Sequence, residues 1–331
     1  MSLYHPVKIG SLELSGNLFL APVAGWTDRA YRSICLGLGA DFCFTELVSS
    51  EAICRNNAKT EPLIRRGKNE TSYAVQLFGA DPEVMRKAAS FLEPYHPDVI
   101  DLNAGCPVPK VTKTGAGSAL MKNPILLGKI VHALVSVSNE RLNGAPVTVK
   151  MRSGWDNGSI NYTECARAAI DEGAAMISLH PRTRAQVYSG KSNWDYICDL
   201  ASRVDIPVTG SGDLFTATDA KRMLSETGCA AVMFARGAMG NPFIFRETRS
   251  LLLGGCEELK DTNTFAKEKI EIGFRHLDLL ASDLGEKSAC LEMRKIFCAY
   301  TKGIHGGAAL RDRLVHAETI EDYKHILFTG L

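Results

Sequence analysis

The chain has 331 residues, and its 38 basic and 37 acidic side chains leave a formal net charge of +1. Hydrophobic residues make up 45% and charged residues 23% of the sequence, which is typical of a folded globular protein and excludes disorder over most of the length. The balance of charge excludes a surface that is basic all over, but it allows a local basic face for nucleic acid.

No apolar run approaches the roughly 20 residues that a membrane span needs. The first ten residues also lack the basic stretch and apolar core of a secretory signal. We therefore expect no membrane segment, a cytoplasmic location and reduced cysteines.

In chain order, residues 7–17 resemble a short hairpin, and eight short apolar runs follow. The runs are nearly continuous in hydrophobicity and end in Gly, Pro or polar residues, which is typical of strands that are covered on both faces. They are LFLAP (18–22), FCFTE (42–46), YAVQLFG (73–79), VIDLNAG (99–105), PVTVKM (146–151), MISLHP (176–181), PVTGSG (207–212) and AAVMFAR (230–236).

Amphipathic stretches lie between these runs, and several of them open with a capping residue or an early proline. The clearest are residues 81–95, 123–138, 161–173 and 216–228. Eight strands alternating with helices predict an α/β fold of the (β/α)8 TIM barrel type. An open doubly wound sheet is the alternative, but no GxGxxG follows the first strand. The hairpin at 7–17 would plug the N-terminal end of the barrel.

The pattern changes after residue 252. Residues 252–264 form a polar, glycine-containing linker, and the later segments 265–285, 290–304, 309–317 and 319–328 have apolar residues at helical spacing. We therefore predict two domains, a barrel over residues 1–252 and a small all-helical C-terminal domain over residues 253–331.

The ten cysteines are scattered, and no CxxC pair occurs. A zinc or iron–sulfur site is therefore not expected, and most of the thiols read as small core residues. Cys106 is the exception, because its Gly-Cys-Pro turn follows a strand and would project the thiol into the barrel mouth. A thiol that is mostly protonated at neutral pH suits a general acid. A thiolate nucleophile is the weaker interpretation, since no protease-type Cys/His/Asn pattern is apparent.

Chemistry in a barrel of this type lies at the carboxyl ends of the strands. Glycines after the seventh and eighth strands, with Arg236, indicate a phosphate site. Gln76, Lys150 and His180 would suit a planar heterocycle that carries this phosphate, and a cation near a flavin stabilises the reduced form. The alternative to the phosphate site is two ordinary glycine turns. The alternative for His180 is a core histidine whose hydrogen bonds are all made within the protein.

The strand ends resemble the tRNA-dihydrouridine synthases, most closely the bacterial B-type branch. The matching segments include IDLNAGCPVPKVTKTGAGSALMKNP (100–124), VTVKMRSGW (147–155), LHPRTRAQVYSG (179–190) and VMFARGAMGNPFIF (232–245). The resemblance covers nearly the whole chain. It implies an FMN-binding barrel and a helical tRNA-binding domain, and an enzyme that uses NADPH and FMN to reduce the C5–C6 double bond of a uridine in the D-loop of tRNA.

The resemblance also implies residue roles. Cys106 would give a proton to C5 of the uridine. The cofactor would contact Pro22, Val23, Ala24, Gln76, Lys150, His180, Ser211, Gly212, Asp213, Ala235 and Arg236. Asn103, Arg152 and Arg182 would contact the substrate. The family usually has Met at position 23, Met at 104, Asn at 211 and Gly at 235, so the contact of Ala235 with the phosphate is the largest departure.

Residues 287–313 contain six basic and two acidic side chains, a local surplus that suits the RNA backbone. Lys295 and Arg311 are the candidate contacts, and a solvated helix face is the alternative. An FMN barrel enzyme that acts on a free pyrimidine and a non-catalytic RNA-binding protein are the rival functions. We expect no metal, and a monomer as the default.

Overall fold

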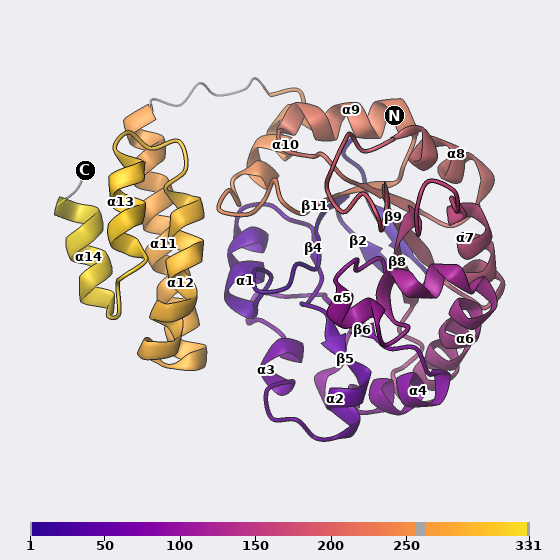
Figure 1. Cartoon of the computed structure of the whole chain (residues 1–331). Helices are drawn as coiled ribbons and strands as arrows, with labels where there is room; N and C mark the ends of the chain where they lie inside the picture. Colours follow the sequence, from indigo (N-terminus) through magenta and orange to yellow (C-terminus); the bar gives the residue numbers. More distant parts are fainter. Residues whose placement is uncertain (1, 256–261, 330–331) are drawn as a thin grey trace.

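The computed structural model describes residues 2–255 and 262–329. Cys256 and the middle of the predicted linker lie outside the described residues. Figure 1 shows a ring of helices around a central sheet and a separate group of helices beside it.

The sheet is a closed parallel barrel. Strand β3 pairs with β11, and all strand pairs of this sheet are parallel. A bridge from Phe44, directly after β4, to Ala74 at the start of β6 closes the ring, so β4 and β5 share one interrupted strand position beside β6. The sheet therefore has the eight strand positions that the sequence predicted. The strands are β3 (Leu18–Leu20), β4 (Phe42–Cys43), β5 (Val48–Ser49), β6 (Ala74–Phe78), β7 (Val99–Ala104), β8 (Val147–Gly154), β9 (Met176–Thr183), β10 (Val208–Ser211) and β11 (Ala231–Phe234).

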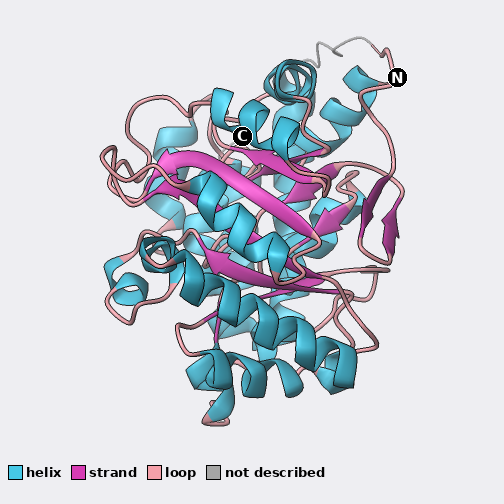
Figure 2. Ribbon diagram, turned by 90° about the vertical axis from the view of Figure 1, so that its right-hand side faces the viewer, coloured by secondary structure: helices cyan, strands magenta, loops and turns pink. Residues whose placement is uncertain are grey.

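Helices cover the outside of the barrel, as Figure 2 shows from the side. Local sequence fixes their starts: Asp81 accepts hydrogen bonds from the N–H groups of Glu83 and Val84, and Thr216 forms a capping box with Asp219. The barrel helices are α1 (Arg29–Gly37), α2 (Ser50–Cys54), α3 (Glu61–Ile64), α4 (Pro82–Ser90), α5 (Pro109–Thr112), α6 (Pro124–Arg141), α7 (Tyr162–Asp171), α8 (Asp195–Arg203), α9 (Ala217–Thr227) and α10 (Ile244–Leu252).

The helix predicted over 81–95 is shorter than expected. It ends at Ser90, and a 3-10 turn at Glu93–Tyr95 follows. Pro94 lacks a backbone N–H and cannot continue an α-helix, which explains the early end.

The N-terminal hairpin closes the bottom of the barrel, as predicted. Its strands are β1 (Val7–Ile9) and β2 (Leu12–Leu14), and they pair antiparallel. Val7, Ile9 and Leu14 pack into a buried cluster with residues from the starts of the barrel strands, including Phe19 and Phe42. This apolar layer separates the polar upper part of the barrel interior from solvent below.

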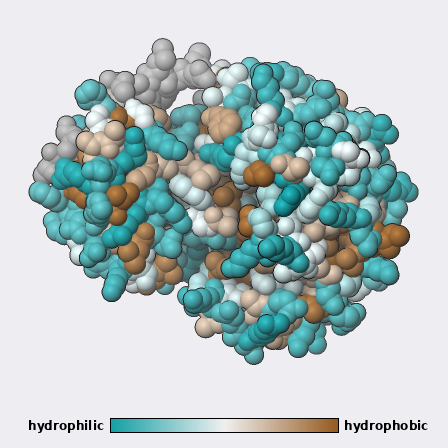
Figure 3. All heavy atoms as spheres, viewed as in Figure 1, coloured by the Kyte–Doolittle hydropathy of each residue, from teal (hydrophilic) through white to brown (hydrophobic). Residues whose placement is uncertain are grey.

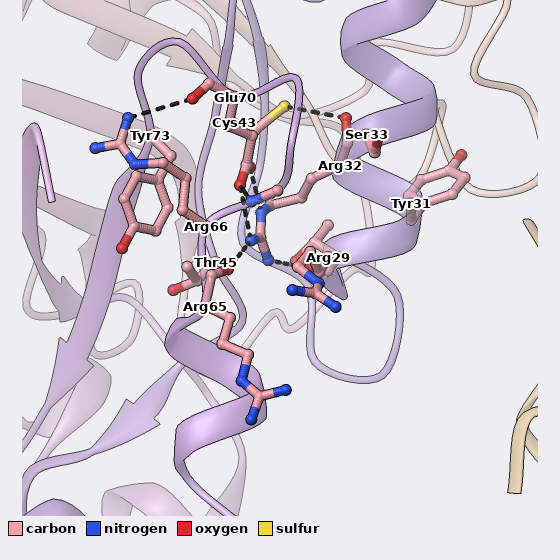
Figure 4. Close-up of polar contacts among 12 residues, drawn as sticks. Arg29, Tyr31, Arg32, Ser33, Cys43, Thr45, Arg65, Arg66, Glu70 and Tyr73 are labelled. Atoms are coloured by element: carbon pink, nitrogen blue, oxygen red, sulfur yellow. Dashed lines mark hydrogen bonds and ion pairs between the residues drawn. The ribbon is translucent and has the colours of Figure 1, made fainter. Parts of the chain in front are cut away.

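A buried ion pair between Arg32 on α1 and Glu70 holds the start of α1 against the segment before β6 (Figure 4). Arg32 donates to the Glu70 carboxylate at 2.6 and 3.1 Å, and both side chains are wholly inaccessible to solvent. The same guanidinium donates to the carbonyls of Thr27 and Arg65 at 3.2 and 2.8 Å. One buried cation therefore ties the loop after β3 to the segment between α3 and β6.

The C-terminal region is helical, as predicted. It consists of α11 (Thr262–Leu284), α12 (Glu286–Tyr300), α13 (Gly307–Leu314) and α14 (Ile320–Thr329). Gly285, with φ +80°, separates the first two helices. The whole group lies beside α1, where the ring of Tyr31 stacks on buried His276 at 5.3 Å and Arg29 pairs with Asp283.

The face of the molecule in Figure 3 is mostly hydrophilic, and its hydrophobic side chains lie in small groups. No helix in the described part of the chain is long and apolar enough to cross a membrane.

Candidate active site

A cavity of about 340 Å³ opens at the carboxyl ends of the barrel strands. It is lined by residues from at least six of the eight strand ends, so side chains that are distant in sequence meet there. Of the predicted residues, the lining includes Pro22, Val23, Ala24, Asn103, Cys106, Lys150, Arg152, His180, Ser211, Gly212, Asp213, Ala235 and Arg236. Gln76, Arg182, Lys295 and Arg311 do not line it.

The Cys106 turn is held on several sides. Asn103 Oδ1 accepts hydrogen bonds from the backbone N–H groups of Gly105 and Cys106, at 3.2 and 2.9 Å. Arg152 Nε donates to the Gly105 carbonyl at 2.9 Å, and the backbone and hydroxyl of Ser118 donate to the Cys106 carbonyl. Burial raises the pKa of the Cys106 thiol. The thiol is therefore protonated at neutral pH, as a proton donor must be.

A chain of amides lies below this turn. Asn103 Nδ2 donates to Gln76 Oε1 at 2.8 Å, and Gln76 Nε2 donates to Asp101 Oδ2 at 2.7 Å. Thr148 Oγ1 donates to the other Asp101 oxygen at 2.6 Å. Gln76 is fully buried and uses both ends of its amide within the protein, so its predicted contact with a cofactor stays a prediction.

Lys150 brings a buried cation to the cavity. Within the described part of the chain it has no hydrogen bond or ion pair. Burial lowers its pKa to about 8, helped by the nearby Arg152. Asn103 and Lys150 are register partners on β7 and β8, as Arg152 and His180 are on β8 and β9. The strand pairing thus gathers these four side chains.

His180 is neutral in this setting. Burial, and then the cations Arg152 and Lys150, push its pKa well below the ordinary histidine value. Arg182 Nη1 lies 3.4 Å from His180 Nε2. Because a guanidinium can only donate, this contact assigns Nε2 as the acceptor and leaves the proton on Nδ1.

The loop after β10 forms a narrow cradle. Gly212 has φ +109°, and a Cβ there would lie 2.3 Å from Ser192 Oγ and 2.8 Å from His180 Cδ2. Ser192 Oγ is buried and has no hydrogen-bond partner among the described residues. Ser211 Oγ donates to the Met233 carbonyl at 2.9 Å and so joins β10 to β11.

Arginines neutralise the one carboxylate of this cradle. Arg182 donates to both oxygens of Asp213, at 2.9 and 2.8 Å, and Arg236 donates to one at 3.2 Å. Burial alone would raise the pKa of Asp213, but the Arg182 hydrogen bond and charge lower it. Arg182 is itself buried behind the cradle, so its predicted contact with a substrate stays a prediction.

Aromatic side chains that sequence reasoning missed line the cavity edge. The Arg236 guanidinium lies 4.3 Å from the Tyr188 ring centroid and 5.3 Å from that of Phe215. Tyr188 is 50% exposed and Phe215 is 48% exposed. The preceding residue Val187 has φ +50°, which is unusual for a β-branched residue. Its carbonyl accepts a hydrogen bond from Arg152 at 2.9 Å, so the strained loop is tied to the site.

The two basic residues predicted to contact RNA lie in the helical region. Lys295 on α12 pairs with Glu292 at 2.8 Å, yet its Nζ would be 2.9 Å from a Cβ on Gly25, in the loop after β3. Lys295 thus reaches the barrel rim. Arg311 on α13 is half-buried, and its Nη1 lies 3.4 Å from the Thr301 carbonyl. Their contact with RNA stays a prediction.

The described cysteines differ in burial. Five of the nine are buried, Cys54, Cys106 and Cys298 are partly buried, Cys198 is exposed, and all nine are free thiols. Burial alone does not set Cys106 apart. The described residues contain no group of three or more His, Cys, Asp or Glu side chains that could hold a metal ion.

Comparison with known proteins identifies the family. The sequence matches the family described as dihydrouridine synthase (Dus) over residues 19–328. It is 49% identical to a probable tRNA-dihydrouridine synthase of Treponema pallidum, over 98% of this chain and 96% of that protein. It is 33% identical to tRNA-dihydrouridine synthase B of Pasteurella multocida, over 92% of this chain and 90% of that protein.

A solved structure supports the fold alone. A variant of NCR from Zymomonas mobilis superimposes with a TM-score of 0.52 at 15% identity, covering 76% of this chain and 92% of that chain. The chain belongs to the dihydrouridine synthase family, a family of oxidoreductases.

Proposed function

We propose that this dihydrouridine synthase reduces the C5–C6 double bond of a uridine in the D-loop of tRNA to 5,6-dihydrouridine, with bound FMN and with NADPH as the reductant. The observation that carries the proposal is one cavity in which a protonated thiol, a buried ammonium group without a hydrogen-bond partner among the described residues, and the glycine-containing loops with Arg236 meet. A barrel mouth that served only to bind RNA would not need a buried ammonium group without a partner.

The residues of the cavity fit FMN. Only a glycine fits at position 212, because a Cβ would collide with Ser192 and His180, so the backbone of this loop lies bare at the cavity. Ser192 Oγ beside it is a buried polar atom without a partner among the described residues. Arg236 and the backbone N–H groups after β10 and β11 would hold the terminal phosphate. Pro22, Val23 and Ala24 would lie along the ring system, and Lys150 and His180 would bind its polar edge.

FMN, when bound, supplies the hydride that carbon C6 of the uridine takes up. Lys150 stabilises negative charge on the bound heterocycle electrostatically. Asn103 can present only an N–H donor to the cavity, because its oxygen is occupied by the Cys106 turn, and this donor suits a uracil carbonyl. The Cys106 thiol delivers the proton to C5, and Arg152 keeps the turn in place through the Gly105 carbonyl.

Residues 1–252 form the proposed catalytic domain and residues 253–331 the proposed tRNA-binding domain. Lys295 supports this assignment because it lies on α12 and reaches the loop at the barrel mouth. RNA bound across both parts would have phosphates near Lys295 and Arg311 while a uridine enters the cavity. We also propose that the protein acts in the cytoplasm as a monomer.

Mapping of dihydrouridine in tRNA tests the proposal. A strain that lacks this gene is expected to lose dihydrouridine at one or more D-loop positions, and the wild-type gene but not Cys106→Ala is expected to restore it. The purified protein is expected to release FMN on denaturation. Release of FAD, or activity on free uracil but none on tRNA, would contradict the proposal.

A further inference from the structure

Asp101 is a charged residue in the barrel interior to which the proposed chemistry gives no role. It lies on β7 and is fully inaccessible to solvent, and burial raises its pKa to about 6. Its two oxygens accept from Gln76 Nε2 at 2.7 Å and from Thr148 Oγ1 at 2.6 Å. Gln76 and Thr148 are its register partners on the neighbouring strands β6 and β8. A buried carboxylate is costly, so its retention calls for a reason.

The chain of hydrogen bonds that starts at Asp101 has one direction. An ionised carboxylate only accepts, so Gln76 must turn its NH2 group toward Asp101 and its oxygen toward Asn103. Asn103 must then donate to Gln76 through its own NH2 group. This leaves the Asn103 oxygen free to accept from the turn above.

At the other end of these hydrogen bonds, the Gly105–Cys106 turn requires the same orientation of the two amides. The N–H groups of Gly105 and Cys106 can only donate, and both point at Asn103 Oδ1. If either amide were reversed, two donors would face each other in a buried place, which costs about 1–3 kcal/mol for each group left unsatisfied. The carboxylate at one end and the peptide groups at the other therefore fix both amide orientations.

We propose that Asp101 is a positioning residue for Cys106. It acts through Gln76 and Asn103 to hold the Gly105–Cys106 turn so that the thiol faces the cavity. The functional meaning of this inference rests on the proposed role of Cys106 as a proton donor, but the positioning itself does not depend on a cofactor or on RNA.

Two substitutions at Asp101 separate the hydrogen-bond chain from the charge. Asp101→Asn keeps an oxygen for Gln76 and can donate its NH2 group to the Thr148 hydroxyl, so it preserves the chain and removes the charge. Asp101→Leu has a similar size but leaves Gln76 Nε2 without an acceptor. Thr148→Val is the matched control, because it removes the other partner of Asp101 and leaves the Gln76 branch intact.

The first readout is the rate at which iodoacetamide alkylates Cys106 in the flavin-free protein, followed by peptide mass spectrometry. Cys198 is exposed on α8 and serves as the internal reference. We expect Asp101→Leu to raise the Cys106 rate relative to Cys198 by roughly three- to ten-fold, which corresponds to the loss of about one hydrogen bond. Asp101→Asn and Thr148→Val are expected to stay within about two-fold of the wild type.

A folded Asp101→Leu protein whose Cys106 rate stays within about two-fold of the wild type would overturn the proposal. Equal increases in the Leu and Asn variants would also overturn it, because the charge and not the chain would then matter. Gln76→Met cuts the same chain one step further on and carries the same expectation, so it decides the question if the Leu variant does not fold.

The second readout compares the two half-reactions of the loaded enzyme. Asp101→Leu is expected to slow uridine reduction in tRNA at least about three-fold more than NADPH oxidation, and Asp101→Asn is expected to restore the balance. A merely structural defect would slow both halves alike and would overturn the proposal. If the wild-type enzyme does not act on tRNA, the proposed function fails, while the alkylation result still decides the positioning role.

Discussion

Substitution of Glu70 by glutamine should lower the stability of the protein, because among the described residues Glu70 is the only carboxylate hydrogen-bonded to the buried Arg32 guanidinium. Arg32 and Glu70 are both wholly inaccessible, and two hydrogen bonds of 2.6 and 3.1 Å join them. The introduced amide keeps one acceptor oxygen but turns an NH2 group toward Arg32 or toward the Gly67 N–H, which also bonds to this carboxylate.

Breaking a buried pair by neutralising one partner costs about 3–5 kcal/mol. For a chain of this length the unfolding entropy converts that cost into a fall of about 4–7 °C in the melting temperature. The matched control is Glu61→Gln, which removes the exposed partner of Arg65, the residue directly after α3. An exposed pair four residues apart contributes about 0.3–0.5 kcal/mol, or less than about 1 °C.

Differential scanning calorimetry at neutral pH measures both variants against the wild type. A fall of less than about 1 °C for Glu70→Gln would contradict this expectation, because the buried pair would then contribute no more than the exposed pair does. An equal fall in both variants would refute it too, since burial would not be the cause.

Three further predictions concern the cavity and the helical region. Arg236→Ala should weaken FMN binding by at least about ten-fold, because a charge-assisted contact contributes about 1.5–3 kcal/mol; unchanged affinity in a fluorescence titration would locate the phosphate elsewhere. Joint charge reversal of Lys295 and Arg311 should raise the tRNA Kd and leave NADPH oxidation unaffected. The log–log slope of Kd against salt should fall by about one unit for each lost phosphate contact, and an unchanged slope would show that the basic stretch is only a solvated helix face. Lys150→Met should stabilise the flavin-free protein at pH 7, because burial lowers the Lys150 pKa from 10.5 to about 8 and its charge therefore disfavours folding. That advantage should shrink as the pH rises from about 8 to 10.5, and a calorimetric difference that does not change with pH would contradict it.

The fold was predictable because its signals are local. Each of the eight apolar runs contains or overlaps a barrel strand, and the hairpin predicted over residues 7–17 is present as β1 and β2 and closes the barrel bottom. The cap at Asp81 and the capping box at Thr216 mark helix starts through contacts two or three residues away. The end of α4 lies earlier than predicted, because Pro94 interrupts a stretch whose apolar spacing alone would continue the helix.

The site was predictable only in part. Strand ends meet in any such barrel, so Cys106, Lys150 and His180 could be assigned to one cavity from their positions alone. The pairing of Arg182 with Asp213 and the aromatic contacts of Arg236 with Tyr188 depend on loops that fold over the rim. No sequence period encodes such contacts. Gln76 lies two residues before the end of β6, and nothing in the sequence indicates that it lies below the cavity and does not line it.

Stopped-flow flavin absorbance with Cys106→Ala decides whether the thiol is the proton donor. NADPH is expected to bleach the flavin of the variant at close to the wild-type rate, because that step needs no proton from the thiol. Reoxidation by tRNA should be at least about 100-fold slower, since general acid catalysis contributes roughly 10²–10⁴-fold. Equal loss in both steps would indicate damaged cofactor binding, and an unchanged rate with tRNA would remove Cys106 from the mechanism.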